Sequence, residues 1–365
     1  MENITEKIDE FSADAMLFKN ASMYVTFQIG YYIHLVTPGV ILAFGSAGNI
    51  LSFLVMVQKR NICRTTCLYM AALAVADNIT LVCLATYWIV TCFQTDTSVH
   101  TNTILCKVFA YISQTCSEFS IFVLGAMTID RYVAIRFPMR STTLCTIQRT
   151  RVILISGLLT LGLYNIPIPW MTGVHNRNLC AAFFTKNTQT VIYSWIYICM
   201  CTIIPFCSLL TFNYLIISAI HRHKRELADL SANMMELTSK TDGGSKYFRR
   251  SHFLRKSRLK NSRENQLTAM LLFVTFTFLA LTLPQYIRYI VYADIHFKES
   301  AKEYALNTLL YHISNKLWFS NSAVNFYLYC LCGSKFRSDL KKLFPCYTGK
   351  TVSVIYSQSQ TNASL

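Results

Sequence analysis

An aspartate and an arginine stand side by side at the end of a long apolar run, in the segment "TIDRYVAIRFP". The stretch before them, "EFSIFVLGAM", is apolar except for Glu118. Neighbouring opposite charges can form a charge-assisted hydrogen-bonded pair, and a second carboxylate can share the arginine. Glu264 lies 20 residues before Pro284, about 30 Å along a helix, which places it at the depth of Arg131. The spacing therefore predicts a latch in which Asp130 and Glu264 hold Arg131, and in which motion of the Glu264 segment exchanges the pairs.

A second polar set lies inside the apolar runs. Asp77 is a lone carboxylate, Ser120 precedes the arginine by 11 residues, and Asn321 and Asn325 are one helical turn apart. All four side chains can converge, and oxygen ligands of this kind suit a hard cation. The alternative is a water-filled polar network around a neutral Asp77, because burial disfavours the charged form of a carboxyl group.

The elements that carry these groups are indicated by composition. The chain has 365 residues, of which 53% are hydrophobic and 14% are charged, whereas about a quarter of an ordinary soluble domain is charged. Seven runs hold only Asp77, Glu118 and Lys316 as charges, and they lie at about 32–57, 66–93, 108–129, 152–174, 190–220, 265–287 and 304–331. About 20 residues of helix cross the hydrocarbon core, so the sequence predicts an all-α membrane protein with a seven-transmembrane helix bundle. Strands of an outer-membrane barrel are about half as long, which excludes that class.

Basic residues orient the seven runs. Of the 34 lysines and arginines, 25 follow runs one, three, five and seven. The positive-inside rule makes that side cytoplasmic, so residues 1–31 are expected to form an extracellular tail and 32–333 the membrane domain. Residues 222–263 are then the third cytoplasmic loop, and 334–365 a short amphipathic helix with a cytoplasmic tail. The net charge of +16 fits anionic lipid and cytosolic partners better than nucleic acid.

Covalent features follow from the same orientation. Cys106 lies 25 residues before the arginine, about 37 Å of helix, so it faces the exterior, where disulfides persist. Cys180 is the cysteine expected on the same side, so a Cys106–Cys180 disulfide is predicted. The alternative is that both thiols are free. Asn3 and Asn20 begin glycosylation triplets in the extracellular tail. Cys346, just past the amphipathic stretch, is a palmitoylation candidate.

Taken together, these motifs resemble the fingerprints of the rhodopsin-like (class A) G-protein-coupled receptors, in the order of that family. They are Asn49 in "GSAGNIL", Asp77 in "LAVAD", Cys106, "DRY" at 130–132, Cys180, Pro205, Phe278 with Pro284, and "NFYLY" at 325–329. The resemblance covers about residues 32–344 and implies a receptor rather than an enzyme, with a heterotrimeric G protein, arrestin and receptor kinases as partners. It also identifies the Asp77 set as the sodium pocket of the family, so an allosteric sodium ion is the one cofactor implied.

The resemblance implies that the inner end of the bundle couples to the G protein. The residues to which it gives that role are Asp130, Arg131, Tyr132, Tyr214, Glu264 and Tyr329.

Several positions depart from the family pattern. Thr282 stands in "LTLP", where a tryptophan is usual, and Asn213, followed by Tyr214, stands where a tyrosine is usual. Phe326 replaces a proline, so the seventh helix keeps one more backbone hydrogen bond and is expected to be less kinked. The segments "NSAVNFYLYCLCGSKFR" and "RFPMRSTTLCT" resemble the FMRFamide-type branch of invertebrate neuropeptide receptors, where phenylalanine replaces this proline.

The resemblance also narrows the ligand. Ser113 stands where amine receptors have an aspartate, and Phe319 where opsins have the retinal lysine, so neither an amine nor retinal is favoured. Glu118 could bind a basic side chain of a peptide, and Arg288 a carboxylate or an amide oxygen. The candidate ligand-binding residues are Trp88, Ser113, Glu118, Arg288, Tyr289, Tyr292, His312 and Lys316.

An internal role is the alternative for these charges. Glu118 could be neutral and hydrogen-bonded, or paired with Lys316, while Arg288 could reach the outer surface.

Three hypotheses for function remain. The first is a plasma-membrane receptor for a short neuropeptide that signals through heterotrimeric G proteins. The second is a receptor of the same fold for a small molecule or a chemosensory cue. The third is a transporter or channel, which the odd number of runs and the absence of two similar halves disfavour.

Overall fold

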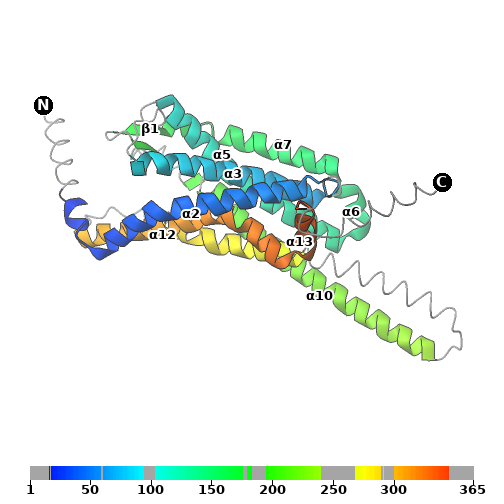
Figure 1. Cartoon of the computed structure of the whole chain (residues 1–365). Helices are drawn as coiled ribbons and strands as arrows, with labels where there is room; N and C mark the ends of the chain where they lie inside the picture. The colour runs from blue at the N-terminus through cyan, green and yellow to red at the C-terminus, as the bar shows by residue number, and fades with distance from the viewer. Residues whose placement is uncertain are drawn as a thin grey trace, which may run out of the picture.

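The computed structural model describes residues 16, 18–58, 61–93, 103–175, 179–182, 195–196, 198–239, 268–288, 291 and 300–344. Within these residues the chain forms a bundle of seven long helices (Figure 1). They are α2 (Val25–Met56), α3 (Thr65–Phe93), α5 (Thr103–Arg136), α7 (Ile147–Tyr164), α10 (Ile204–Ser239), the sixth helix (Thr268–Arg288) and α12 (Ala301–Cys332). Each overlaps one of the seven apolar runs, so the predicted helical bundle is confirmed.

Shorter elements mark the two ends of the bundle. Short helical elements among the described residues include α6 (Pro138–Leu144), α8 (Ile168–Met171), the π-helical turn η1 (Cys199–Ile203) and α13 (Ser334–Lys341). The strands β1 (Thr172–His175) and β2 (Leu179–Ala182) pair antiparallel, and the sequence did not predict this hairpin. Figure 1 shows the hairpin at one end and α6 with α13 at the other. α13 buries Phe336 and Asp339 against the bundle, as an amphipathic helix should.

Apolar character separates two kinds of helix within the described residues. Five of the long helices are apolar enough to cross a membrane by length and composition alone, whereas α5 and α12 are not among them. Both of these carry charged groups that are buried inside the protein, such as Glu118 and Lys316. Because those charges face neighbouring helices rather than lipid, α5 and α12 can still span the membrane.

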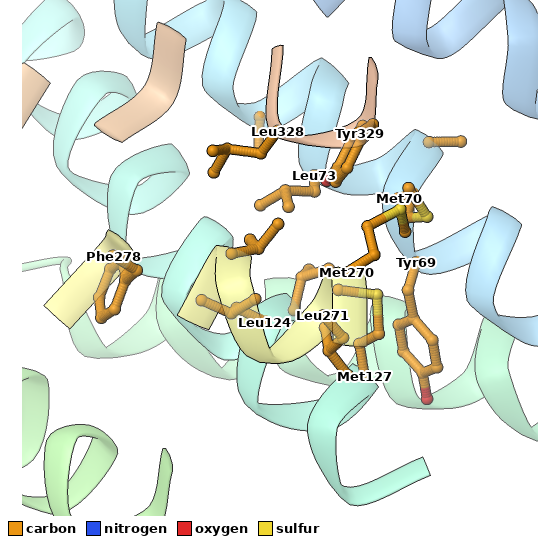
Figure 2. Packing of buried hydrophobic residues seen from close by; sticks show 14 of the residues in the cluster. Tyr69, Met70, Leu73, Leu124, Met127, Met270, Leu271, Phe278, Leu328 and Tyr329 are labelled. Atoms are coloured by element: carbon orange, nitrogen blue, oxygen red, sulfur yellow. The ribbon is translucent and has the colours of Figure 1, made fainter. Parts of the chain in front are cut away.

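The helices α2, α3 and α12 pack against one another at a glycine. A Cβ atom at Gly45 would lie 2.5 Å from Leu81 Cδ1 and 2.7 Å from Ala323 Cβ. Only a residue without a side chain allows this approach, which brings the polar faces of the three helices together. A core of buried hydrophobic side chains lies between the helices. Its members include Tyr69, Met70, Leu73, Leu124, Met127, Met270, Leu271, Phe278, Leu328 and Tyr329 (Figure 2).

Proline shapes the start of α10. Pro205 lacks a backbone N–H and its ring crowds the turn before it, so it is tolerated only near a helix start or at a distortion. The five residues of η1 immediately precede Ile204 and Pro205, and they form the wider π-helical turn. α10 then continues to Ser239 and projects beyond the bundle (Figure 1). α10 therefore continues into the segment predicted to be the third cytoplasmic loop, residues 222–263, and residues 240–267 lie outside the described part.

Candidate functional site

Asp130 and Arg131, near the C-terminal end of α5, form an ion pair with each other. Arg131 Nη2 lies 2.7 Å from Asp130 Oδ2, and the two side chains are 17% and 7% exposed. Thr65, the first residue of α3, donates from Oγ1 to Asp130 Oδ2 at 3.0 Å. The same hydroxyl accepts from Arg131 Nη2 at 3.2 Å. Thr65 of α3 therefore contacts both members of the pair, and these contacts do not involve the sixth helix.

The backbone of Asp130 accepts a hydrogen bond from a cysteine. Cys145, at the C-terminal end of α6, donates from Sγ to the carbonyl oxygen of Asp130 at 3.7 Å. Burial, and then the charge of Asp130, raises the pKa of the Cys145 thiol to about 11. The thiol is thus neutral at physiological pH and adds no charge to the pair.

The other predicted coupling residues lie in different environments. Tyr132 is half-buried and its ring centroid is 5.7 Å from that of Phe212 on α10. Tyr329 is 2% exposed, and its hydroxyl has no hydrogen-bond partner among the described residues. Tyr214 is 70% exposed and faces away from the bundle. Glu264 lies outside the described residues, so its contact with the arginine stays a prediction.

The Asp77 set is brought together deep in the bundle. Asp77 is completely buried and accepts a hydrogen bond of 2.8 Å from Asn325 Nδ2. Ser120 and Ser322 lie close enough to interact with the same carboxylate. Even so, Asp77 Oδ1 and Ser120 Oγ have no partner at hydrogen-bonding geometry within the described part of the chain. Buried orphan oxygens need a partner, and a cation or water between them would supply one, so the residues fit a sodium ion.

Asn321 does not join the set as predicted from its spacing. It is half-buried and makes no hydrogen bond to Asp77 among the described residues, whereas Ser322 beside it interacts with the carboxylate. Asn49 supports this arrangement by donating from Nδ2 to the backbone oxygen of Ser322 at 2.9 Å. In the structure, Ser322 therefore lies at the carboxylate of Asp77, where the spacing had predicted Asn321.

Glu118 lies in the middle of α5 among neutral amides. Gln114 Nε2 donates to Glu118 Oε1 at 2.8 Å, and Asn165 Nδ2 donates to Glu118 Oε2 at 2.7 Å. Asn165, at the C-terminal cap of α7, is completely buried and Glu118 is 5% exposed. Ser113, farther out on α5, is half-buried. Both carboxylate oxygens are thus engaged within the protein, which agrees with the internal alternative for Glu118.

Basic groups gather in the outer half between α2, the sixth helix and α12. The rings of His34 and His312 lie 4.8 Å apart, and Lys316 is near enough to interact with both. The guanidinium carbon of Arg288 lies 4.7 Å above the ring of Tyr311. His34 was not among the predicted ligand-binding residues, although a histidine in an apolar run was a signal for it.

Trp88 belongs to the contact between α3 and α2. Its indole Nε1 donates to Leu35 O at 2.9 Å, and its ring covers Gly39. Tyr289 and Tyr292 lie outside the described residues.

The structure describes some of the residues predicted to carry a disulfide, a glycan or a palmitoyl group. Cys106 is fully buried and disulfide-bonded. Cys180 lies in β2, where its backbone pairs with Val174 of β1. Asn20 is exposed at the start of the described chain, while Asn3 and Cys346 lie outside it.

Comparison with known proteins decides the family. The family model for the 7 transmembrane receptor (rhodopsin family) matches residues 48–329. The chain belongs to this family. It is therefore a multi-pass membrane receptor and not an enzyme.

Three relatives illustrate how far the receptor has diverged. It is 23% identical to growth hormone secretagogue receptor type 1 of Mustela putorius furo over 328 residues, which cover 86% of this chain and 82% of the relative. It is 25% identical to galanin receptor 2b of Danio rerio over 349 residues, with coverage of 92% and 81%. It is also 29% identical to human G-protein coupled receptor 35 over 184 residues, or 50% of this chain and 56% of that one.

Sequence reasoning missed four partners of the receptor's buried carboxylates, namely Thr65, Gln114, Asn165 and Ser322. Thr65 and Asn165 flank apolar helices at positions where a threonine or asparagine is ordinary, so no spacing marked them. Ser322 shares a helix face with Asn325, as Asn321 also does, because three and four residues both return to the same side of a helix. Helix packing, rather than periodicity, selected among them.

Proposed function

We propose that the receptor is activated from outside by a short neuropeptide and transmits that signal to a heterotrimeric G protein. The observation that carries the proposal is the closed cluster of Arg131, Asp130 and Thr65 at the inner end of a rhodopsin-family bundle. A peptide is favoured over a small chemosensory ligand because the growth hormone secretagogue and galanin receptors are peptide-ligand receptors. The resemblance to the FMRFamide-type branch supports the same class of ligand.

The ligand would act on the outer half of the bundle. The basic groups Arg288, His312 and Lys316 lie there on the sixth helix and α12, with His34 opposite. They favour an acidic or carbonyl-rich part of a peptide. Glu118 already accepts two hydrogen bonds from amides, so its role is to join α5 to α7, and a basic ligand group would have to displace an amide to reach it.

At the inner end, activation requires that Arg131 be released. Its bonds to Asp130 and Thr65 must break before its guanidinium can face a G protein. The proposed contact with Glu264 would be lost at the same time, when the inner end of the sixth helix moves outward. Peptide and G protein each favour the open arrangement, so by linkage each raises the affinity of the other.

The Asp77 set is proposed to modulate this equilibrium. Asp77, Ser120, Ser322 and Asn325 would hold a sodium ion, which would supply the positive charge that the orphan oxygens lack. Because these residues belong to α3, α5 and α12, an ion among them would favour the arrangement in which the three helices are close.

Several further properties belong to the proposal. We expect the receptor in the plasma membrane with its N-terminus outside, arrestin and receptor kinases as partners, and lipid contact along its apolar faces. A Cys106–Cys180 disulfide would fasten the hairpin to the outer end of α5, which already packs against β1. Glycans at Asn3 and Asn20 and a palmitoyl group at Cys346 complete the expected modifications.

The test is a ligand screen with a nucleotide-exchange readout. Purified receptor in lipid nanodiscs is mixed with G protein and a library of amidated and free-acid neuropeptides, and guanine-nucleotide exchange is measured. Exchange that depends on a peptide, and that is lost in Arg131→Ala, supports the proposal. Exchange driven only by small molecules would favour the chemosensory alternative, and solute flux without exchange would contradict the receptor mechanism.

A further inference from the structure

A buried polar contact joins α10 to the sixth helix. Asn213 Nδ2 donates a hydrogen bond of 2.8 Å to Thr275 Oγ1. Thr275 Oγ1 donates in turn to the backbone oxygen of Leu272 at 2.9 Å. The amide of α10 is thus tied through a hydroxyl to the backbone of the sixth helix. Asn213 is 1% exposed and Thr275 is 0% exposed, so water does not reach this chain of bonds.

Apolar side chains surround the contact on both helices. Leu209 and Ile216 are buried about one turn to either side of Asn213 on α10. Leu271 and Val274 are buried next to Thr275 on the sixth helix. In such surroundings an amide donor that loses its acceptor keeps the full cost of desolvation, which is larger than the net gain from an ordinary hydrogen bond. The contact therefore resists separation of the two helices for as long as water does not reach the amide.

The position of the contact relates it to the switch. Thr275 belongs to the sixth helix and follows Glu264 by 11 residues in the sequence. The structure has Arg131 closed against α3 and has Asn213 bonded to the sixth helix at the same time. An outward movement of the sixth helix from α10 must break the second contact as well as the first.

We propose that Asn213 and Thr275 form a clasp that holds the sixth helix against α10 in the closed receptor. Asn213 is then a positioning residue for activation, at the place where the family usually has a tyrosine. The clasp also accounts for the outward orientation of Tyr214, because its neighbour occupies the inward position. This inference deepens the proposed function, since it adds a second restraint on the same helix movement.

The two residues of the clasp have different hydrogen-bond partners, so replacing one should not have the same effect on helix separation as replacing the other. Thr275→Val removes the acceptor and leaves the amide of Asn213 buried without a partner, so the closed state should lose stability. Asn213→Leu also removes the bond between the helices, but it leaves the hydroxyl of Thr275 bonded to Leu272, so it should open the receptor less than Thr275→Val does. The double variant lacks the bond between the helices but also lacks the unpaired amide, so it should resemble Asn213→Leu rather than Thr275→Val.

The experiment measures the separation of the helices directly. Fluorophores are introduced as unnatural amino acids at the exposed positions Arg225 of α10 and Ala269 of the sixth helix, and energy transfer is recorded in nanodiscs without peptide or G protein. Thr275→Ser keeps the hydroxyl and serves as the conservative variant. Thr277→Val is the matched control, because its exposed hydroxyl donates only within its own helix, to Phe273 O at 2.8 Å.

The clasp predicts that Thr275→Val raises the separated fraction about three- to tenfold, while the serine variant and the Thr277 control stay at the parent level. Adding Asn213→Leu should lower that rise to the smaller level of the Asn213→Leu variant alone. A separated fraction unchanged in Thr275→Val, or one as high or higher in the double variant, would overturn the clasp. Thr275→Ala tests the same loss of acceptor if the valine variant does not fold.

Neither ligand nor G protein takes part in this measurement. A receptor that answers to no peptide would contradict the proposed function and leave this result standing, whereas unchanged helix separation would contradict the clasp alone.

Discussion

Two buried carboxylates on α5 have opposite kinds of partner. Asp130, at the inner end, is paired with the charge of Arg131 and with the hydroxyl of Thr65. Glu118, 12 residues or about 18 Å away along the helix, accepts hydrogen bonds from the neutral amides of Gln114 and Asn165. The first cluster joins groups whose charges can reach water when they separate. The second lies where separation would leave the carboxylate in an apolar interior.

The difference indicates that one cluster can switch and the other cannot. Charged groups near the membrane boundary can exchange protein partners for water at modest cost. A carboxylate in the middle of a bundle has no such alternative, so its amide partners act as a permanent joint between α5 and α7. We therefore expect changes at the inner cluster to alter signalling, and changes at Glu118 to alter stability.

Replacement of the arginine should have the largest effect. Arg131→Ala removes the group that we propose is released toward the G protein, so peptide-stimulated nucleotide exchange should fall by at least about 100-fold. Peptide binding, measured separately, should change little. Arg136→Ala, an exposed arginine in the last turn of the same helix, is the matched control. Equal exchange in the parent and the Arg131 variant would remove this residue from the mechanism.

Loss of the charge on its partner should open the switch. Asp130→Asn keeps the shape of the side chain but leaves Arg131 with weaker partners, so ligand-free exchange should rise about tenfold. The rise is smaller than that for a fully buried pair, because the Arg131 side chain is 17% exposed. Basal exchange at the parent level in a well-expressed variant would show that the pair does not hold the closed state.

The amide cluster should respond through stability instead. Asn165→Leu removes one donor to Glu118, which should lower the free energy of unfolding by about 2 kcal/mol and the melting temperature by a few degrees. Basal exchange of the folded receptor should be unchanged. Gln148→Leu makes the same kind of replacement at an exposed position at the start of α7. A raised basal exchange in the Asn165 variant would erase the distinction between the two clusters.

Removal of a single hydroxyl should have the smallest effect. Thr65→Val preserves the shape of the side chain and deletes one bond to each member of the charged pair. Ligand-free exchange should therefore rise about two- to fivefold. Thr66→Val changes the next residue, which makes no hydrogen bond to the pair among the described residues. A response equal to that control would place Thr65 outside the switch.

Much of the architecture was readable from the sequence because the bilayer imposes simple rules. The length of each apolar run predicted a spanning helix, and all seven long helices of the described structure overlap those runs. The same rules predicted that Cys106 and Arg131 lie at opposite ends of α5, since a helix has a constant rise. The hairpin of β1 and β2 escaped prediction because its four-residue strands carry little periodic signal.

The candidate site was predictable in its residue types and less so in its pairings. The sequence by itself determined that Asp77, Glu118 and Asp130 would be costly groups in or near a membrane, each in need of a partner. Tertiary structure decided which partners they received, among them Ser322 for Asp77, Asn165 for Glu118 and Thr65 for Asp130.

The physical reason is that a buried polar group requires a hydrogen-bond partner, whereas the distance between two helices decides which residue can be that partner. That approach depends on residues such as Gly45, where the absence of a side chain brings α2 against α3 and α12. Periodicity along one helix carries no information about this distance.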